Sequence, residues 1–302
     1  MRTVVALVIT VISVLLSGCG AASGPGVPAS ASQHRSNSAA GQLSIGSVRA
    51  LADLVVRRIR SAGNAEMSHS VIKFRAVEYY ATVSDAGLPS SFTAFATDTR
   101  DFTVQPSSSA LVDVVGYSAP RFMTPSERAR WQAAGKPPLS AGAVTGQTFS
   151  IPTGKFSFIP QGTPLTYQQV KSLPGSPQAI RSEIATHLRP YAGMHPSVTA
   201  VLRQLGFLLA TAPLATNARS ATWSVLVSLP GLHLCGQGRD LVGRYGQWIC
   251  ASTRTDQIEV LLDTRTGSVL AVAERLLKAD SHWFPGVPAG SIVQSDAFIP
   301  GL

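Results

Sequence analysis

Residues 257–277 read QIEVLLDTRTGSVLAVAERLL, and this stretch decides the fold. Two runs of aliphatic and β-branched residues flank the turn sequence Asp263-Thr264-Arg265-Thr266-Gly267, in which Gly267 can take a left-handed conformation. The pattern predicts an antiparallel β-hairpin. The runs around it predict one further strand at 239–250 before the hairpin and an edge strand at 291–298 after a link rich in proline and glycine.

Further strands are predicted nearer the N-terminus. Runs at 70–84, 92–105 and 109–118 predict an antiparallel meander, and 147–159 predicts another strand. Their aromatic side chains are open to two interpretations. They could line a ligand cavity on a concave face, or they could pack in the core and across strands. The residues concerned are Tyr79, Tyr80, Phe92, Phe95 and Phe102.

Helices are predicted at both ends of the meander and in the middle of the chain. Apolar residues from Val48 to Ala62 recur at three- and four-residue steps, which predicts an amphipathic helix that ends near Gly63. Its arginine-rich face either lies on anionic lipid or is hydrated. Short helices are predicted after Thr124 and Thr166. Three more are predicted between 176 and 228, and the second of these is apolar enough to lie beneath the sheet.

The first eighteen residues, MRTVVALVITVISVLLSG, combine a basic start, an apolar run and small residues before Cys19. This pattern is typical of a secretory signal, and the run is too short for an ordinary membrane span. Residues 19–42 are rich in Gly, Ala, Ser and Pro and predict a flexible tether with a reach of about 25–30 Å. Residues 43–302 then form a single predicted α+β extracytoplasmic domain.

Leu16-Ser17-Gly18-Cys19 resembles the lipobox of bacterial lipoproteins. The resemblance implies that residues 1–18 are removed and that Cys19 is diacylated. The lipid would then hold the protein on the extracytoplasmic face of the cell membrane. The alternative is a plain signal peptide with an incidental cysteine.

Charge and cysteine content fit an exported protein. Twenty-five Lys and Arg residues against 16 Asp and Glu give a formal net charge of +9. This excess either attracts anionic lipids and acidic polymers or forms a solvated basic face. Without zinc-finger spacing or an RNA-binding aromatic motif, we expect no nucleic-acid partner. Once Cys19 is lipidated, Cys235 and Cys250 remain, and an oxidising compartment favours a disulfide between them. Its loop closure would stabilise the fold by about 3 kcal/mol.

Motifs for chemistry are absent from the sequence. It has no Gly-x-Ser-x-Gly elbow, no His-Glu-x-x-His helix, no phosphate loop and no calcium loop. The glycines at 236, 238 and 243 indicate turns near the disulfide. No two histidines have metal-ligand spacing on a helix; they are His34, His69, His187, His195, His233 and His282. We therefore expect no enzyme activity, catalytic residue, metal or cofactor, although a serine-histidine-carboxylate site assembled in three dimensions stays open.

Several motifs between 120 and 298 occur in a familiar order. They are Pro125–Trp131 with Gly135–Leu139, Leu165-Thr166-Tyr167, Leu173-Pro174, Ser228-Leu229-Pro230-Gly231 and Leu262–Gly267. Together they resemble a family of uncharacterised extracytoplasmic actinobacterial proteins. The resemblance implies a fold similar to the open half-barrels of lipoprotein carriers and envelope-stress sensors. Many relatives carry a cytoplasmic segment and a membrane helix instead of a lipobox, and the Cys235–Cys250 pair is outside the family pattern. The family has no established activity, so it assigns no functional residue.

The sequence thus predicts an α+β fold in which a curved antiparallel sheet, an open half-barrel, wraps around or packs on several helices. The function expected first is a membrane-anchored, non-enzymatic, monomeric module that binds an apolar or lipid ligand. The alternative is an envelope protein-interaction or sensing module, which a filled core and an exposed apolar patch would favour. An exported hydrolase is the third expectation.

Overall fold

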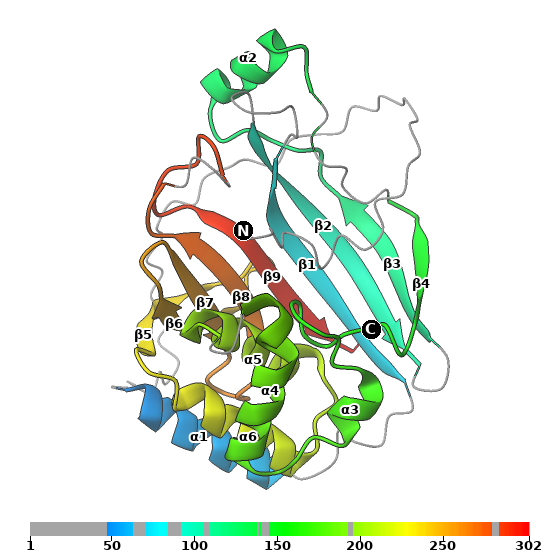
Figure 1. Cartoon of the computed structure of the whole chain (residues 1–302), viewed down its shortest axis with the longest axis vertical. Helices are drawn as coiled ribbons and strands as arrows, with labels where there is room; N and C mark the ends of the chain where they lie inside the picture. Colours follow the sequence, from blue (N-terminus) through cyan, green and yellow to red (C-terminus); the bar gives the residue numbers. More distant parts are fainter. Residues whose placement is uncertain are drawn as a thin grey trace.

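The structure is a computed structural model that describes residues 47–62, 71–83, 92–105, 109–137, 139, 145–192, 196–279 and 284–301 (Figure 1). The predicted signal peptide at 1–18, Cys19 and the tether at 19–42 lie outside the described residues. So do four of the six histidines: His34, His69, His195 and His282.

Within the described residues, nine antiparallel strands form one curved, open sheet in the order β4-β3-β2-β1-β9-β8-β7-β6-β5 (Figure 1). The strands are β1 Ile72–Val83, β2 Thr93–Val104, β3 Ser109–Tyr117, β4 Thr148–Pro152, β5 His233–Arg239, β6 Tyr245–Ser252, β7 Asp256–Leu262, β8 Val269–Leu276 and β9 Ile292–Pro300. The N-terminal meander is present as β1–β3, and the predicted hairpin is present as β7 and β8. The predicted α+β fold with a curved antiparallel sheet is confirmed.

Six helices accompany the sheet within the described residues. They are α1 Val48–Ala62, α2 Pro125–Ala133, α3 Tyr167–Lys171, α4 Pro177–Ala192, α5 Val198–Thr211 and α6 Thr216–Val227. Helix α5 packs directly on β6–β9, α4 and α6 pack against α5, and α1 packs on α6 (Figure 1). Helix α2 lies away from this group, beyond the upper ends of β1 and β2 (Figure 1). None of the described helices has both the length and the apolar character needed to cross a membrane.

Helix α5 approaches the sheet closely because a glycine faces it. A Cβ atom on Gly206 would lie 2.8 Å from a methyl of Val272 and 3.2 Å from one of Val260. Phe207 on the same helix packs edge-to-face on Phe298 of β9, with ring centroids 5.0 Å apart. The prediction that the second central helix lies beneath the sheet is therefore confirmed.

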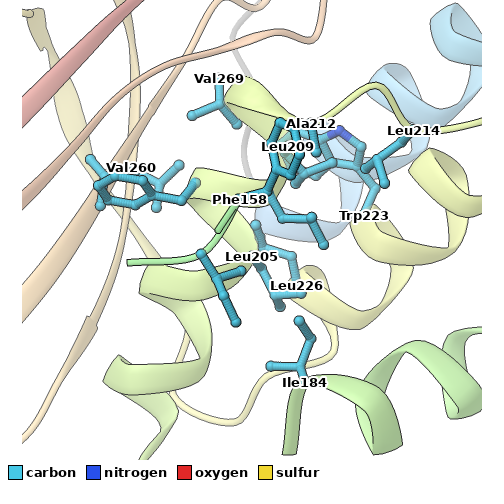
Figure 2. Packing of buried hydrophobic residues seen from close by; sticks show 14 of the residues in the cluster. Phe158, Ile184, Leu205, Leu209, Ala212, Leu214, Trp223, Leu226, Val260 and Val269 are labelled. Carbon is cyan, nitrogen blue, oxygen red and sulfur yellow. The ribbon is translucent and has the colours of Figure 1, made fainter. Parts of the chain in front are cut away.

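The hydrophobic core fills the space between α5 and its neighbours. Leu205, Leu209, Trp223 and Leu226 come from α5 and α6, and Phe158 enters from the segment after β4 (Figure 2). These side chains are buried, because each helix turns its apolar face toward the sheet or toward another helix.

The C-terminal strand corrects one prediction. Segment 291–298 was expected at an edge, but β9 lies between β1 and β8, near the centre of the sheet. Val293 and Ala297 point to one side, Asp296 and Phe298 point to the other, and all four are buried. The strand therefore joins the N-terminal meander to the C-terminal hairpins.

Two strand boundaries also differ from the predictions. The run at 147–159 stays in the sheet only to Pro152, because 153–155 form a turn, after which Phe156 and Phe158 insert into the core. The run at 239–250 is divided by a turn at 240–244. Residues 233–239, which contain two of the glycines expected in turns, form strand β5 instead.

Candidate functional site

Three acidic side chains lie in one row across the middle of the sheet. Glu78 on β1 is the direct cross-strand partner of both Asp98 on β2 and Asp296 on β9. Because strand residues alternate between faces, these three share the helix-covered side with Phe74 and Phe298 of the core. Their exposed fractions are 5%, 0% and 2%. Like charges placed directly opposite each other destabilise a sheet, so this acidic row is unusual for a purely structural position.

A second row of polar residues lies beside the acidic row. Tyr80 pairs with Gln294, and Gln294 pairs with Glu274 on β8. Two arginines complete the group, Arg100 from β2 and Arg203 from α5. We call these eight residues the acidic patch: Glu78, Tyr80, Asp98, Arg100, Arg203, Glu274, Gln294 and Asp296. Its carboxyl groups outnumber its guanidinium groups, on a chain that is otherwise basic.

Arg100 neutralises one end of the acidic row. Its Nη2 donates to Oδ2 of Asp98 at 2.7 Å, and its Nη1 lies 3.7 Å from Oε2 of Glu78. The Tyr80 hydroxyl donates to Oδ1 of Asp98 at 3.3 Å. Asp98 therefore has one short charged donor and one longer neutral donor, whereas the cation nearest to Glu78 among the described residues is 3.7 Å away.

The other end of the row is less well neutralised. Arg203 donates to the Glu274 carboxylate and, at 3.4 Å, to Oε1 of Gln294. Gln294 in turn donates through Nε2 to Oδ2 of Asp296 at 3.1 Å. Asp296 thus reaches Arg203 through a neutral amide and makes no ion pair among the described residues.

Burial and mutual repulsion raise the pKa values of two carboxyl groups of the row, those of Asp296 and Glu78. Burial raises the pKa of Asp296 well above its ordinary value, the charge of Glu78 raises it further, and Arg203 and Arg100 oppose the shift. Burial also raises the pKa of Glu78, with Arg100 opposing and Asp98 adding. Asp296 and Glu78 therefore retain their protons to higher pH than ordinary carboxyl groups do.

Replacing Asp296 by asparagine should stabilise the folded protein near neutral pH. The pKa of Asp296 is raised in the folded state, so its contribution is most favourable below its unfolded pKa of about 3.9 and is lost as pH rises through the folded pKa. Asparagine has nearly the same shape and does not titrate. We expect the unfolding free energy to rise by about 1–2 kcal/mol at neutral pH, with a flatter pH profile above about pH 4.

Urea unfolding across this pH range measures the effect. Asp101→Asn is the matched control, because Asp101 lies on β2 of the same sheet and forms a partly exposed pair with Arg75, on the opposite side of the sheet from Asp296. If Asp296→Asn destabilised the protein and left its pH profile unchanged, the proposed titration of Asp296 would be wrong.

The patch holds two buried polar atoms that are unpaired in the described part of the chain. One is an acceptor, Oδ1 of Asp296, and the other is a donor, Nε of Arg100. Tyr80 and Gln294 beside them are half-buried, and the Glu274 side chain is 22% exposed, so the second row forms the accessible side. Convergent polar groups with shifted pKa values are typical of ligand-binding sites.

A separate groove lies among the helices. It has a volume of about 650 Å³ and is bordered by the end of α1 and the beginnings of α4 and α6. Among the described residues that line the groove, Arg60 is the one with an ionisable side chain. The acidic patch therefore contains more ionisable side chains than the described lining of the groove.

The predicted cysteine pair is joined in the structure. Cys235 on β5 and Cys250 on β6 have Cα atoms 5.9 Å apart and form a disulfide at the point where the pairing of the two strands shifts register. The disulfide predicted from the cysteine count is thus present in the structure. Cys19 lies outside the described residues, so lipidation stays a prediction.

The candidate aromatic residues divide between packing and the patch. Phe102 stacks on Phe74 with ring centroids 4.6 Å apart, and Tyr79 stacks on Phe95 at 5.3 Å. Phe92 is buried. These contacts favour ordinary packing for most of the set, whereas Tyr80 belongs to the acidic patch.

Neither metal binding nor a catalytic triad finds support in the described residues. No group of three or more His, Cys, Asp or Glu side chains there could hold a metal ion. His187 contacts the carbonyl of Thr163 at 2.8 Å and Glu183 at 3.2 Å, and His233 contacts the carbonyl of Gly231 at 3.1 Å. Within the part of the chain that the structure describes, neither of these histidines makes a hydrogen bond to a serine.

Comparison with known proteins found no matching family model, no matching curated protein and no matching solved structure. The resemblance to the actinobacterial family therefore stays a prediction. The functional interpretation rests on the geometry of this chain.

Proposed function

We propose that the protein is a membrane-anchored, non-enzymatic binding module of the cell envelope whose ligand presents a positively charged group to the acidic patch. The observation that carries the proposal is the environment of the Asp296 carboxyl group. This carboxyl group is buried, has one oxygen with no hydrogen-bond partner among the described residues, and lies directly opposite a second carboxyl group. An ammonium group beside it would supply the missing donor and relieve the repulsion within the row.

The close packing of helix α5 on the sheet favours a polar binding site over an apolar cavity. Helix α5 packs closely on the sheet through Gly206 and Phe207, so the helix-covered side beneath β7 and β8 is occupied by protein. The lipid ligand expected from the sequence fits if it carries a cationic head group. A small free amine has the same recognition chemistry.

Octylammonium and octanol form a matched pair of probes. We expect octylammonium to bind and octanol to bind much more weakly, because only the first carries a charge. The affinity should rise with pH, because Asp296 and Glu78 must lose their protons to pair with the cation, whereas an alkylammonium stays charged to about pH 10. Asp296→Asn should weaken binding about tenfold.

Calorimetric titration of the full chain measures these affinities. Asp101→Asn is again the control, since its half-exposed side chain lies on the opposite side of the sheet. Equal binding of octanol, or undiminished binding by Asp296→Asn, would refute an ammonium site at the patch. A native ligand found by mass spectrometry of the purified protein would then distinguish an aminolipid from a soluble amine.

An exposed apolar patch supports the alternative, a module that docks an envelope protein. The turn between β5 and β6 exposes Leu241 and Val242 by 41% and 40%, and the first residue of β6, Tyr245, is 45% exposed. The guanidinium of Arg239 lies 5.9 Å from the Tyr245 ring centroid. This patch is small, so we rank docking second, and failure of octylammonium to bind would make it the leading candidate.

A further inference from the structure

Helix α2 projects from the body of the protein with its surface uncovered. It lies beyond the upper ends of β1 and β2, at the opposite end of the molecule from α1 (Figure 1). None of its nine residues is buried. It is nevertheless fixed to the body, because the Arg130 guanidinium lies 5.5 Å from the centroid of the Phe92 ring and the Glu127 carboxyl group lies against Gly286. The helix is thus held in place while most of its surface faces solvent.

The projecting segment is basic. We call residues 121–137, which contain α2, the α2 tip. Four cations against the single carboxylate of Glu127 give the tip a net charge of +3. The cations are Arg121, Arg128, Arg130 and Lys136. Arg130 pairs with Glu127 at 2.7 Å, whereas the other three are exposed and form no ion pair with a described residue. Three unpaired cations on a projecting surface favour a partner with dense negative charge.

Apolar side chains accompany these cations. Met123 is 46% exposed, and Phe122 and Trp131 are half-buried, with their ring centroids 5.3 Å apart. Tryptophan and basic residues together are typical of segments at the membrane–water interface, where the ring enters the head-group region and the cation meets lipid phosphates. The composition of the α2 tip therefore favours a lipid surface.

The backbone at Lys136 provides independent support. Lys136 has a φ of 56° and is the one non-glycine residue with positive φ in the described part of the chain. Its N–H donates to the Trp131 carbonyl at 3.0 Å, and the Trp131 indole N–H donates to the Pro137 carbonyl at 2.8 Å. Trp131 thus holds the lysine in a conformation that glycine would adopt without strain. A lysine retained at such a position indicates a use for its charge.

We propose that the α2 tip binds the surface of a membrane that contains anionic lipid. Arg128 and Lys136 contact lipid phosphates, and Met123 and Trp131 enter the head-group region. A stable protein interface covers about 800 Å² on each partner, which is more than one face of a nine-residue helix provides, whereas a lipid surface adapts to a small projecting shape. The contact is separate from the acidic patch and needs no lipid on Cys19.

Vesicles with brominated acyl chains, which quench tryptophan fluorescence, test the proposal on the full chain. The difference between the parent chain and Trp131→Phe reports Trp131 alone, so vesicle binding by the apolar N-terminal run does not contribute. We expect phosphatidylglycerol vesicles to quench Trp131 and phosphatidylcholine vesicles not to quench it. Arg128→Gln should raise the lipid concentration needed for half-maximal quenching about fivefold, and Arg128→Gln with Lys136→Gln about twenty-five-fold.

The control removes two charges from α1 instead. Arg57 and Arg60 are exposed on that helix, at the other end of the molecule (Figure 1). We expect Arg57→Gln with Arg60→Gln to leave the quenching of Trp131 unchanged. An equal effect of the two double variants would show general attraction of a basic protein to anionic lipid and would overturn the proposal. Absence of Trp131 quenching by phosphatidylglycerol would overturn it as well.

Two further measurements exclude unfolding and a protein partner. Lys136→Gly should weaken vesicle binding about fivefold and leave the thermal midpoint unchanged or higher, because glycine accepts a φ of 56°. Weakened binding would then not reflect loss of the fold. Soluble polyglutamate carries dense negative charge without a lipid surface. If it bound the tip while phosphatidylglycerol vesicles did not, an acidic protein would replace the membrane as the partner.

Discussion

Replacing Trp223 by alanine is expected to lower the unfolding free energy by about 3–5 kcal/mol. Trp223 lies on α6, is 1% exposed and packs with Leu209, Ala212 and Leu214 (Figure 2). Helix α6 packs against α1, α4 and α5, so the cavity left by the indole would open in the layer that joins these helices. The helices hold one another in fixed positions, so we expect little collapse around the cavity.

Urea unfolding followed by far-ultraviolet circular dichroism measures the loss. Trp131→Ala is the control, since Trp131 lies half-buried on α2 and donates its indole N–H to the Pro137 carbonyl at 2.8 Å. We expect it to cost about 1 kcal/mol. Similar losses in the two variants would mean that Trp223 is not a centre of the core.

Local patterns predicted most of the elements. Thr124 was expected to cap a helix, and its hydroxyl accepts the Glu127 N–H at 3.2 Å at the start of α2. Gly267 was expected to adopt a left-handed conformation, and its φ is 78° in the turn between β7 and β8. Each prediction depends on residues close together in the sequence, where capping and turn preferences act directly.

The order of the strands could not be predicted in the same way. The sequence SIVQSDAF mixes polar and apolar residues, which is typical of a strand with one solvated face. Strand β9 nevertheless has both faces buried, because α5 and the core cover one side and apolar neighbours surround Val293 and Ala297 on the other. Its pairing with β1 joins residues from opposite ends of the chain, and no local pattern encodes that contact.

The acidic patch was missed for the same reason. Glu78, Asp98 and Asp296 lie in three separate strand-forming runs, and a charged residue in such a run usually faces solvent. Only the register of β2, β1 and β9 brings the three into one row. The one available signal was an acidic residue near the centre of each run, which becomes informative once the strands are paired.

Replacing Arg100 by methionine is expected to cost about 3–5 kcal/mol near neutral pH, because it removes the cation bonded to a fully buried carboxylate. Arg100 donates to Asp98, which is 0% exposed, and also lies near Glu78. Methionine fills much of the space of the aliphatic part of arginine, so the loss should be mainly electrostatic. It should therefore shrink as pH falls and Glu78, whose pKa is raised by burial and held down by Arg100, becomes protonated.

Two further variants isolate this electrostatic effect. Adding Asp98→Asn to Arg100→Met should recover part of the lost stability, because the buried charge is removed together with its partner. Arg75→Met is the matched control, since Arg75 pairs with Asp101 across the same two strands at 2.6 Å but is 35% exposed. An exposed pair of this kind contributes about 0–1 kcal/mol. Equal losses for the two arginine variants, or a loss for Arg100→Met that is the same at every pH, would show that the acidic row does not carry buried charge.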